Sequence, residues 1–199
     1  MKKTIGFVRT SIPADLFKKE YALGGLTIYH LDEQLNVEMS AYECWECSVR
    51  SGEYAQDEVM AAFEEFKTKL AASELATAKA QKIAEIDAYD TSDAVNSFIL
   101  NGERVWLGFE LRDRVYQGNE RLLRIGRTDT TLWLGKQCCN LSIEQAQNII
   151  SHIEAYAKDC YNVTAAHKKA VSELTTIEEV EKYDITAGYP EKLEITTYD

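Results

Sequence analysis

Residues 53–87 carry the pattern that most constrains what this chain can fold into. The segment EYAQDEVMAAFEEFKTKLAASELATAKAQKIAEID contains no Gly or Pro, and Ala, Glu and Lys dominate it. These residues favour helix, so we predict one long helix. At about 1.5 Å per residue it would span roughly 50 Å, which indicates a stalk, a linker helix or an oligomer contact. The alternative is a broken helix that folds back on its neighbours.

Apolar residues recur along the first half of this segment at the 4-3-4 spacing of a coiled-coil seam. Two phenylalanines on one face of an isolated surface helix need a cover. We therefore predict a protein–protein contact, in a homo-oligomer or with another protein. The candidate contact residues are Val59, Phe63, Phe66 and Leu70.

The pattern of apolar residues in residues 1–52 predicts a small β-rich unit. Short apolar or alternating runs predict strands at 4–9, 26–30, 37–41 and 42–50. The unit has little core of its own, so we expect it to need a partner and to act as a docking element.

Residues 88–199 form a compact domain that mixes strands and helices. Strands at 97–100 and 104–107 flank Asn101-Gly102, the preferred type I′ hairpin turn. A second strand pair is expected at 130–134 and 138–141, and a final strand at 193–197. We expect this domain, from about residue 89, to fold alone.

Four helices are expected in this domain. The first covers 111–125, with an interruption near Gly118. Ser142 and Gln145 form a capping box that opens the next. Further helices follow at 163–174 and after Thr176. The apolar stripe of the capped helix comprises Ala146, Ile149, Ile150, Ile153, Ala157 and Cys160. The fold class is therefore α+β, in three parts: 1–52, the connector 53–87, and 88–199.

Charge narrows the classes of partner. The formal net charge is −11, which disfavours binding to nucleic-acid phosphates and to anionic membranes. No run approaches the roughly 18 apolar residues of a spanning helix, and the N-terminus lacks the apolar core of a signal peptide. Five cysteines, an odd number, fit reduced thiols in a cytoplasm.

Candidate chemical motifs have plain structural interpretations. Cys44 and Cys47 form a CxxC, but in a strand positions three apart point to opposite faces, so the thiols would diverge. Cys138 and Cys139 are adjacent and diverge in the same way. We interpret the cysteines as small buried residues.

The remaining candidates are histidines and tryptophans. His30, His152 and His167 lie far apart with no nucleophile in context. Trp106 and Trp133 lie in expected strands and are interpreted as core. We predict that the protein is not an enzyme and has no catalytic, cofactor-binding or metal residues.

Five pieces of the second half carry a resemblance. They are AYDTSDAVNSFILNG (88–102), VWL (105–107), TTLWLG (130–135), EAYAKDCYNVTAAH (154–167) and IEEVEKYDITAGYPEKL (177–193). In this order they resemble an uncharacterised domain family common in phages and prophages of gut bacteria. The resemblance covers roughly residues 83–193. Its members tend to lie near tail or tail-fibre genes, and the family offers no catalytic residues to carry over.

The resemblance implies a structural protein of the phage virion, at the tail or the tail-fibre attachment. Such a protein would be made in the host cytoplasm and would contact other phage structural proteins. The alternative is a non-virion chaperone that holds a tail-fibre protein during assembly and then leaves. An enzyme is a third hypothesis, kept only because of the CxxC.

Overall fold

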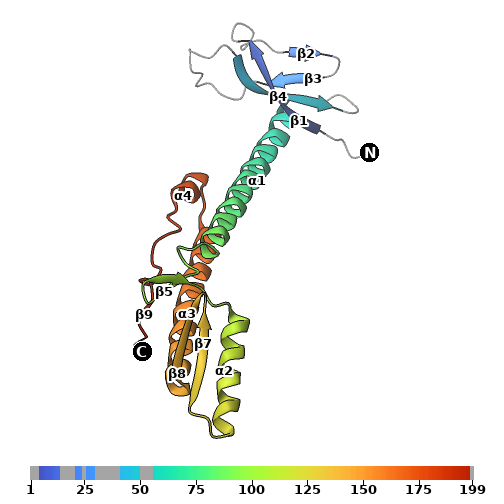
Figure 1. Cartoon of the computed structure of the whole chain (residues 1–199). Helices are drawn as coiled ribbons and strands as arrows, with labels where there is room; N and C mark the ends of the chain where they lie inside the picture. The colour runs from blue at the N-terminus through green and yellow to red at the C-terminus, as the bar shows by residue number, and fades with distance from the viewer. Residues whose placement is uncertain (1–4, 14–20, 24–25, 30–40, 50–55, 198–199) are drawn as a thin grey trace. The chain divides into compact units, whose positions relative to one another are not determined.

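The structure is a computed structural model that describes residues 5–13, 21–23, 26–29, 41–49 and 56–197, with side chains described at residue 61 and from 64 to 197. Its fold class is α+β, as predicted. The chain divides into two compact units, Met1–Glu74 and Leu75–Asp199 (Figure 1). The boundary falls inside the long helix α1, so the last turns of that helix belong to the second unit.

The first unit contains a four-stranded antiparallel sheet in the order β1-β4-β3-β2. Its strands are β1 (Ile5–Pro13), β2 (Tyr21–Leu23), β3 (Leu26–Tyr29) and β4 (Ala41–Val49). Three of the expected strands are confirmed, and β2 was not expected. The strand expected at 37–41 lies outside the described residues except for its last position, which begins β4.

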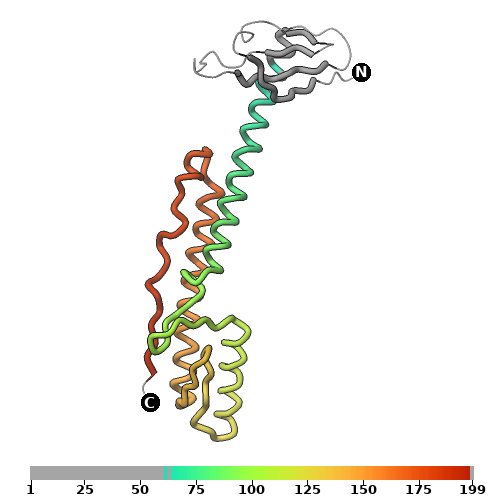
Figure 2. Tube along the Cα trace, turned by 45° about the horizontal axis from the view of Figure 1, so that its top comes forward, coloured from blue at the N-terminus to red at the C-terminus, as the bar shows by residue number. Residues whose placement is uncertain are grey.

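Helix α1 runs without interruption from Gln56 to Asp90, and Figure 2 follows it as one unbroken coil. The single-helix interpretation is therefore confirmed over the broken one. It ends where both the amide and the hydroxyl of Thr91 donate to the carbonyl of Asp87, at 3.1 and 3.0 Å. The side chain of Ile86 is fully buried, so the last turns of α1 contribute to the core of the second unit.

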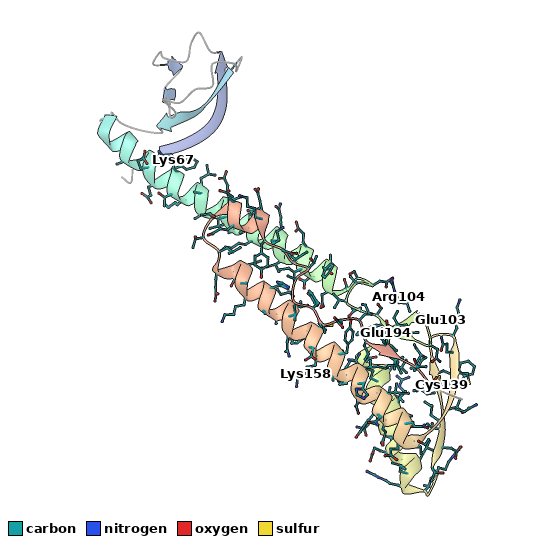
Figure 3. All side chains as sticks on the ribbon, turned by 90° about the vertical axis from the view of Figure 1, so that its left-hand side faces the viewer. Lys67, Glu103, Arg104, Cys139, Lys158 and Glu194 are labelled. Carbon is teal, nitrogen blue, oxygen red and sulfur yellow. The ribbon has the colours of Figure 1, made fainter. Side chains whose placement is uncertain are left out.

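A three-stranded sheet follows, with β5 (Phe98–Leu100) at its centre. Strand β5 pairs antiparallel with β6 (Glu103–Val105) and parallel with β9 (Glu194–Ile195). The hairpin turn has φ 49° at Asn101 and φ 82° at Gly102, as a type I′ turn requires. Figure 3 shows Glu103, Arg104 and Glu194 together on this sheet.

The side chain of Asn101 ties this turn to two other segments. Its Nδ2 donates to Oε1 of Gln137 at 3.0 Å and to Oγ1 of Thr197 at 2.9 Å. Its Oδ1 accepts from the amide of Thr197 at 2.8 Å. One side chain therefore joins the hairpin turn, the second hairpin and the C-terminal segment.

Helix α2 (Phe109–Arg124) passes through Gly118 without a break, so the predicted interruption is wrong. A mid-helix glycine costs only about 1 kcal/mol relative to Ala, which the packing of α2 on its neighbours offsets. The helix ends in a Schellman motif, in which Gly126 has φ 82° and the amide of Arg127 donates to the carbonyl of Leu122 at 3.0 Å.

The second hairpin joins β7 (Asp129–Leu134) to β8 (Gln137–Ser142) through Gly135, which has φ 61°. Buried and exposed residues alternate along both strands. The inward-facing side chains of this hairpin pack on the first half of the next helix, α3, and complete one face of the core.

Helix α3 (Ile143–Glu173) is a single helix. Residues 163–173 are helical as predicted, but the prediction that a separate helix begins at residue 163 is wrong. No Gly or Pro interrupts the segment. The predicted capping box is confirmed, since the amide of Gln145 donates to Oγ of Ser142 at 3.1 Å. The short helix α4 (Ile177–Lys182) has a second capping box, formed by Thr176 and Glu179.

The core of the second unit lies between the two small sheets and the first half of α3. The predicted stripe of α3 faces it, with Ile149 and Ala157 only half-buried. In Figures 1 and 2 the last turns of α1 lie beside the C-terminal half of α3. The main buried cluster comprises Phe98, Leu100, Val105, Leu107, Leu132, Leu134, Cys139, Leu141, Ala146, Ile150 and Ile153.

Candidate protein-contact site on helix α2

Helix α2 buries polar residues on its inner face. Arg112 is 6% exposed and Asn119 is 4% exposed. Nε of Arg112 donates to Oε2 of Glu154 on α3 at 2.6 Å, and its Nη1 donates to the carbonyl of Leu107. The guanidinium also lies 5.5 Å from the centroid of the Trp106 ring. These contacts fix the start of α2 against α3 and neutralise the buried charge.

Three apolar side chains of α2 instead lie on its outer surface. Phe109 is 66% exposed, Tyr116 is 40% exposed and Leu123 is 43% exposed. Their seven-residue spacing puts them on one side of the helix, about two turns apart. We call these three residues the α2 stripe. An apolar stripe of this kind is a feature of surfaces that another protein covers.

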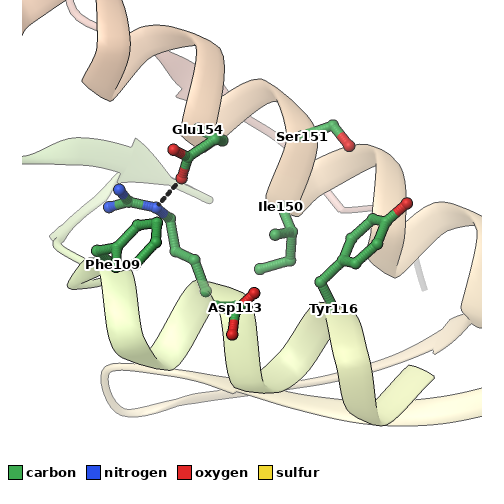
Figure 4. A pocket seen from close by; sticks show the side chains of 7 residues that line it. Phe109, Asp113, Tyr116, Ile150, Ser151 and Glu154 are labelled. Carbon is green, nitrogen blue, oxygen red and sulfur yellow. Dashed lines mark hydrogen bonds and ion pairs between the residues drawn. The ribbon is translucent and has the colours of Figure 1, made fainter. Parts of the chain in front are cut away.

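A hollow of about 440 Å³ lies beside the α2 stripe, between α2 and α3. Figure 4 shows Ile150 pointing from α3 into the space between Phe109 and Tyr116. The hollow thus offers aromatic and aliphatic walls, with the Arg112–Glu154 ion pair at one end. Its full lining is Phe109, Arg112, Asp113, Tyr116, Ile150, Ser151 and Glu154.

A second hollow of about 390 Å³ lies on the outer side of α2. Phe109 and Asp113 line both hollows, so the ring of Phe109 stands between them. Charged residues of both signs line this outer side, namely Glu110, Asp113, Arg114 and Arg121. The surface as a whole suits apolar side chains at the centre and charged groups at the rim.

The contact residues predicted on α1 belong to the first unit, whereas α2 belongs to the second. All four lie within the helix, as expected. Phe66 and Leu70 are half-buried. The side chains of Val59 and Phe63 lie outside the described residues, so the contact predicted for this seam stays a prediction.

The cysteine motif lies on β4, which confirms the strand predicted there. Cys44 pairs with Thr10 and Cys47 with Phe7 across the sheet, and the thiols themselves lie outside the described residues.

The adjacent cysteines of the second unit diverge as predicted, because Cys139 is buried and Cys138 is exposed. The interpretation of Cys138 as a buried residue is wrong, since its strand turns it to the surface. Cys160 is buried, and burial raises the pKa of its thiol.

The histidines do not form a shared site among the described residues. His152 is exposed, and His30 lies outside the described residues. His167 is buried, and its Nε2 donates to the carbonyl of Ala187 at 2.8 Å. Its Nδ1 lies 2.9 Å from the hydroxyl of Tyr183. Both ring nitrogens therefore have partners that hold the segment after α4 against α3.

One of the two tryptophans differs from its predicted role. Trp133 is 63% exposed, so its interpretation as core is wrong. Its neighbours Leu132 and Leu134 take the inward positions of β7, which leaves Trp133 on the outer face. Trp106 follows the end of β6 and packs against the core while half-buried.

The α2 stripe was not found from the sequence. The segment has apolar residues on two sides of a helix, at 109, 116 and 123 and again at 115 and 122. A helix that buries one face needs only one of these two sets, so the second set was the sequence signal that could have revealed the stripe.

The chain matches no protein-family model, no curated protein and no solved structure. No helix in the described part of the chain is both long enough and apolar enough to cross a membrane. Among the described side chains, no three His, Cys, Asp or Glu residues are grouped so that they could hold a metal ion.

Proposed function

We propose that this protein is a structural component of a bacteriophage particle, at the tail or the tail-fibre attachment, and that it acts by protein–protein contact. The observation that supports contact is the α2 stripe, three outward apolar side chains beside a hollow of about 440 Å³. The phage setting is supported by the resemblance of residues 83–193 to a phage and prophage domain family.

The energetics of the α2 stripe favour a partner. Burying a side chain such as Phe or Leu completely is worth about 1.5–3 kcal/mol. Aromatic side chains in pockets are the residues that most often dominate binding between proteins. Phe109 stands between two hollows, so a partner can pack on both sides of its ring.

The surface of the β7–β8 hairpin offers a second apolar contact. Trp133 is exposed on its outer face, opposite Cys138 on the neighbouring strand. A protein with two exposed aromatic surfaces can hold two neighbours, as an adaptor in a particle must.

Quantitative mass spectrometry of purified parent particles tests the proposal. A virion component should be present at a fixed copy number relative to the major tail proteins. The variant Tyr116→Asp, which places a charge in the α2 stripe, should lower that copy number, and Tyr161→Asp is the matched control on an exposed residue of α3.

The second candidate function is that of an assembly chaperone, because an exposed apolar surface can also bind a tail-fibre protein transiently during assembly. That function predicts the protein on unassembled fibre proteins and its absence from finished particles. Absence from both would contradict the phage proposal in either form.

A further inference from the structure

Two aromatic rings line the hollow between α2 and α3, each with a carboxylate that lines the same hollow (Figure 4). Beside Phe109 and Glu154 lies the guanidinium of Arg112, with Cζ 5.9 Å from the centroid of the Phe109 ring and Nε bonded to Glu154. The second set is Tyr116 with Asp113, three residues apart and therefore on one face of α2. Among the described residues, no cation lies over Tyr116 or pairs with Asp113. The arginine of the chain itself thus uses one set and not the other.

The polar groups that line this hollow without a described partner are mainly hydrogen-bond acceptors. The carboxylate of Asp113 makes no hydrogen bond with a described residue, and Glu154 uses only Oε2. Oγ of Ser151 donates its proton to the carbonyl of Gln147 at 2.8 Å, so toward the hollow it can only accept. By contrast Nε and Nη1 of Arg112 already donate within the chain. The hollow therefore suits a group that brings donors.

The charge of the hollow points to a cation. Two carboxylates and one guanidinium line it, which leaves it negative. Of the exposed arginines of α2, Arg114 and Arg121 line the outer hollow instead, and Arg124 lines neither. Lys158 of α3, four residues after Glu154, also lines neither hollow. The formal net charge of −11 adds a long-range attraction for a basic partner.

From these relations we propose that the hollow between α2 and α3 receives an arginine or lysine side chain of a partner protein. The aliphatic stem of that side chain packs on Phe109 and Ile150. Its cationic head lies over the ring of Tyr116 and pairs with Asp113. The volume of about 440 Å³ is enough to enclose one long side chain. The inference deepens the proposed function by giving the chemistry of the partner, and it rests on the α2 stripe being a contact surface.

NMR titration of the isotope-labelled full chain with capped tripeptides tests this proposal. The probes are acetyl-alanyl-X-alanyl amides in which X is arginine, lysine, leucine or glutamate. The arginine and lysine peptides should shift the signals of α2 and of the middle of α3. They should bind at least about fivefold more tightly than the leucine peptide, because an ion pair and a cation–π contact add to the apolar packing. Tighter binding of the leucine or glutamate peptide, or shifts confined to another surface, would overturn the proposal.

The variant Asp113→Asn separates charge from shape. It should weaken binding of the arginine peptide about threefold or more and leave the leucine peptide unaffected, because only the ion pair is lost. Asp159→Asn on the exposed surface of α3 is the matched control, and it should bind both peptides like the parent. Both aspartates are exposed, so neither change disturbs the core. Equal binding of the arginine peptide by Asp113→Asn and the parent would contradict the proposed contact.

The variant Tyr116→Leu tests the aromatic ring while it keeps an apolar side chain. It should weaken the arginine peptide about twofold to threefold, because the cation–π contact is lost. Tyr161→Leu is the matched control on another exposed tyrosine, and it should have no effect. An increase in ionic strength from about 0.05 M to about 0.5 M should also weaken the arginine peptide, and not the leucine peptide. Binding that responds to neither change would mean that the cationic head does not lie at Tyr116.

The two proposals can fail separately. A chain that binds the arginine peptide at this hollow, yet is absent from particles and from fibre intermediates, would remove the phage role and keep the basic anchor. A chain that is present in particles, yet prefers the leucine peptide, would remove the basic anchor and leave the proposed function standing. Self-association through α2 that the arginine peptide does not reverse would assign the stripe to a second copy and would also overturn the inference.

Discussion

Nε of Arg112 lies 2.6 Å from Oε2 of Glu154 and joins the first turns of α2 to the middle of α3. The two groups differ in exposure, since the Arg112 side chain is 7% exposed and that of Glu154 is 48% exposed. Removal of the glutamate leaves a buried cation, whereas removal of the arginine leaves a carboxylate that water can reach.

The burial of Arg112 predicts a larger loss of stability when this ion pair is broken than when an exposed pair is broken. Glu154→Ala should lower the free energy of unfolding by about 2–4 kcal/mol, because the buried Arg112 then loses its counter-charge and keeps the carbonyl of Leu107 as its one hydrogen-bond partner among the described residues. Glu173→Ala, which removes the exposed Lys169–Glu173 pair, should cost less than about 1 kcal/mol. Urea unfolding of the full chain measures both. Equal losses would mean that burial does not govern the Arg112 contact.

The alternation along β7 predicts opposite outcomes at adjacent positions. Leu134 is fully buried, so Leu134→Ala should cost about 2–5 kcal/mol. Trp133→Ala next to it should change the stability by no more than about 0.5 kcal/mol, because the ring is on the surface. Thermal unfolding monitored by circular dichroism distinguishes the two. A costly Trp133→Ala would restore the core role that the structure contradicts.

The capping box of α4 predicts a dependence on pH. Oε2 of Glu179 accepts from the amides of Thr175 and Thr176, both at 3.0 Å. These bonds, that from the Thr175 amide first, hold the pKa of the carboxyl below its ordinary value of 4.5. A lowered folded pKa adds stability above the unfolded value, and that stability is lost as the pH falls through the folded pKa.

Amide hydrogen exchange in α4 checks this dependence. Glu179→Gln should speed exchange at neutral pH, and the difference from the parent should shrink as the pH falls below 4.5. Glu181→Gln, exposed on the same helix, is the matched control and should leave the exchange unchanged. A difference that persists at the lowest pH would show that the cap does not depend on the charge.

Thiol reactivity should follow burial in the second unit. Cys138 is exposed and should react readily with iodoacetamide in the folded protein. Cys160 should be protected, because burial both excludes the reagent and raises the pKa of the thiol, which lowers its thiolate fraction. Peptide mass spectrometry reports each cysteine separately. Comparable labelling of the two cysteines would contradict the packing around α3.

The contacts of the last turns of α1 predict where a stable fragment of the second unit can begin. A fragment starting at Leu75 keeps Ile86, which is fully buried, and Asp90, whose Oδ1 accepts from Thr164 at 2.6 Å. It should unfold cooperatively. A fragment starting at residue 89 loses Ile86 and should be less stable by at least about 2 kcal/mol. Equal stability of both fragments would mean that α1 contributes nothing to this core.

Local signals in the sequence predicted most of the fold of the second unit. Asn101-Gly102 and the Ser142 capping box specify their turns through side chains and backbone angles within four residues. The ends of helices that depend on packing between distant segments were harder to predict. Gly118 predicted a break because its cost is local, whereas the contacts that hold α2 together across it come from α3.

The candidate site on α2 could not be predicted from the sequence, for a related reason. Ordinary preference puts aromatic residues inside and charged residues outside, yet Arg112 is buried in α2 and Phe109 and Tyr116 are exposed. The glutamate that makes this arrangement stable comes from α3, 42 residues further along the chain. No pattern within α2 alone reveals that partner.

The parallel pairing of β5 with β9 sets an order of events during synthesis. Asn101 and Thr197, which it brings together, are 96 residues apart in the chain. At roughly 5–20 residues per second, a ribosome takes about 5–20 s to make the segment between them. Throughout that interval one edge of β5 has no strand beside it. The nascent second unit therefore waits with an open sheet edge until β9 emerges and closes it.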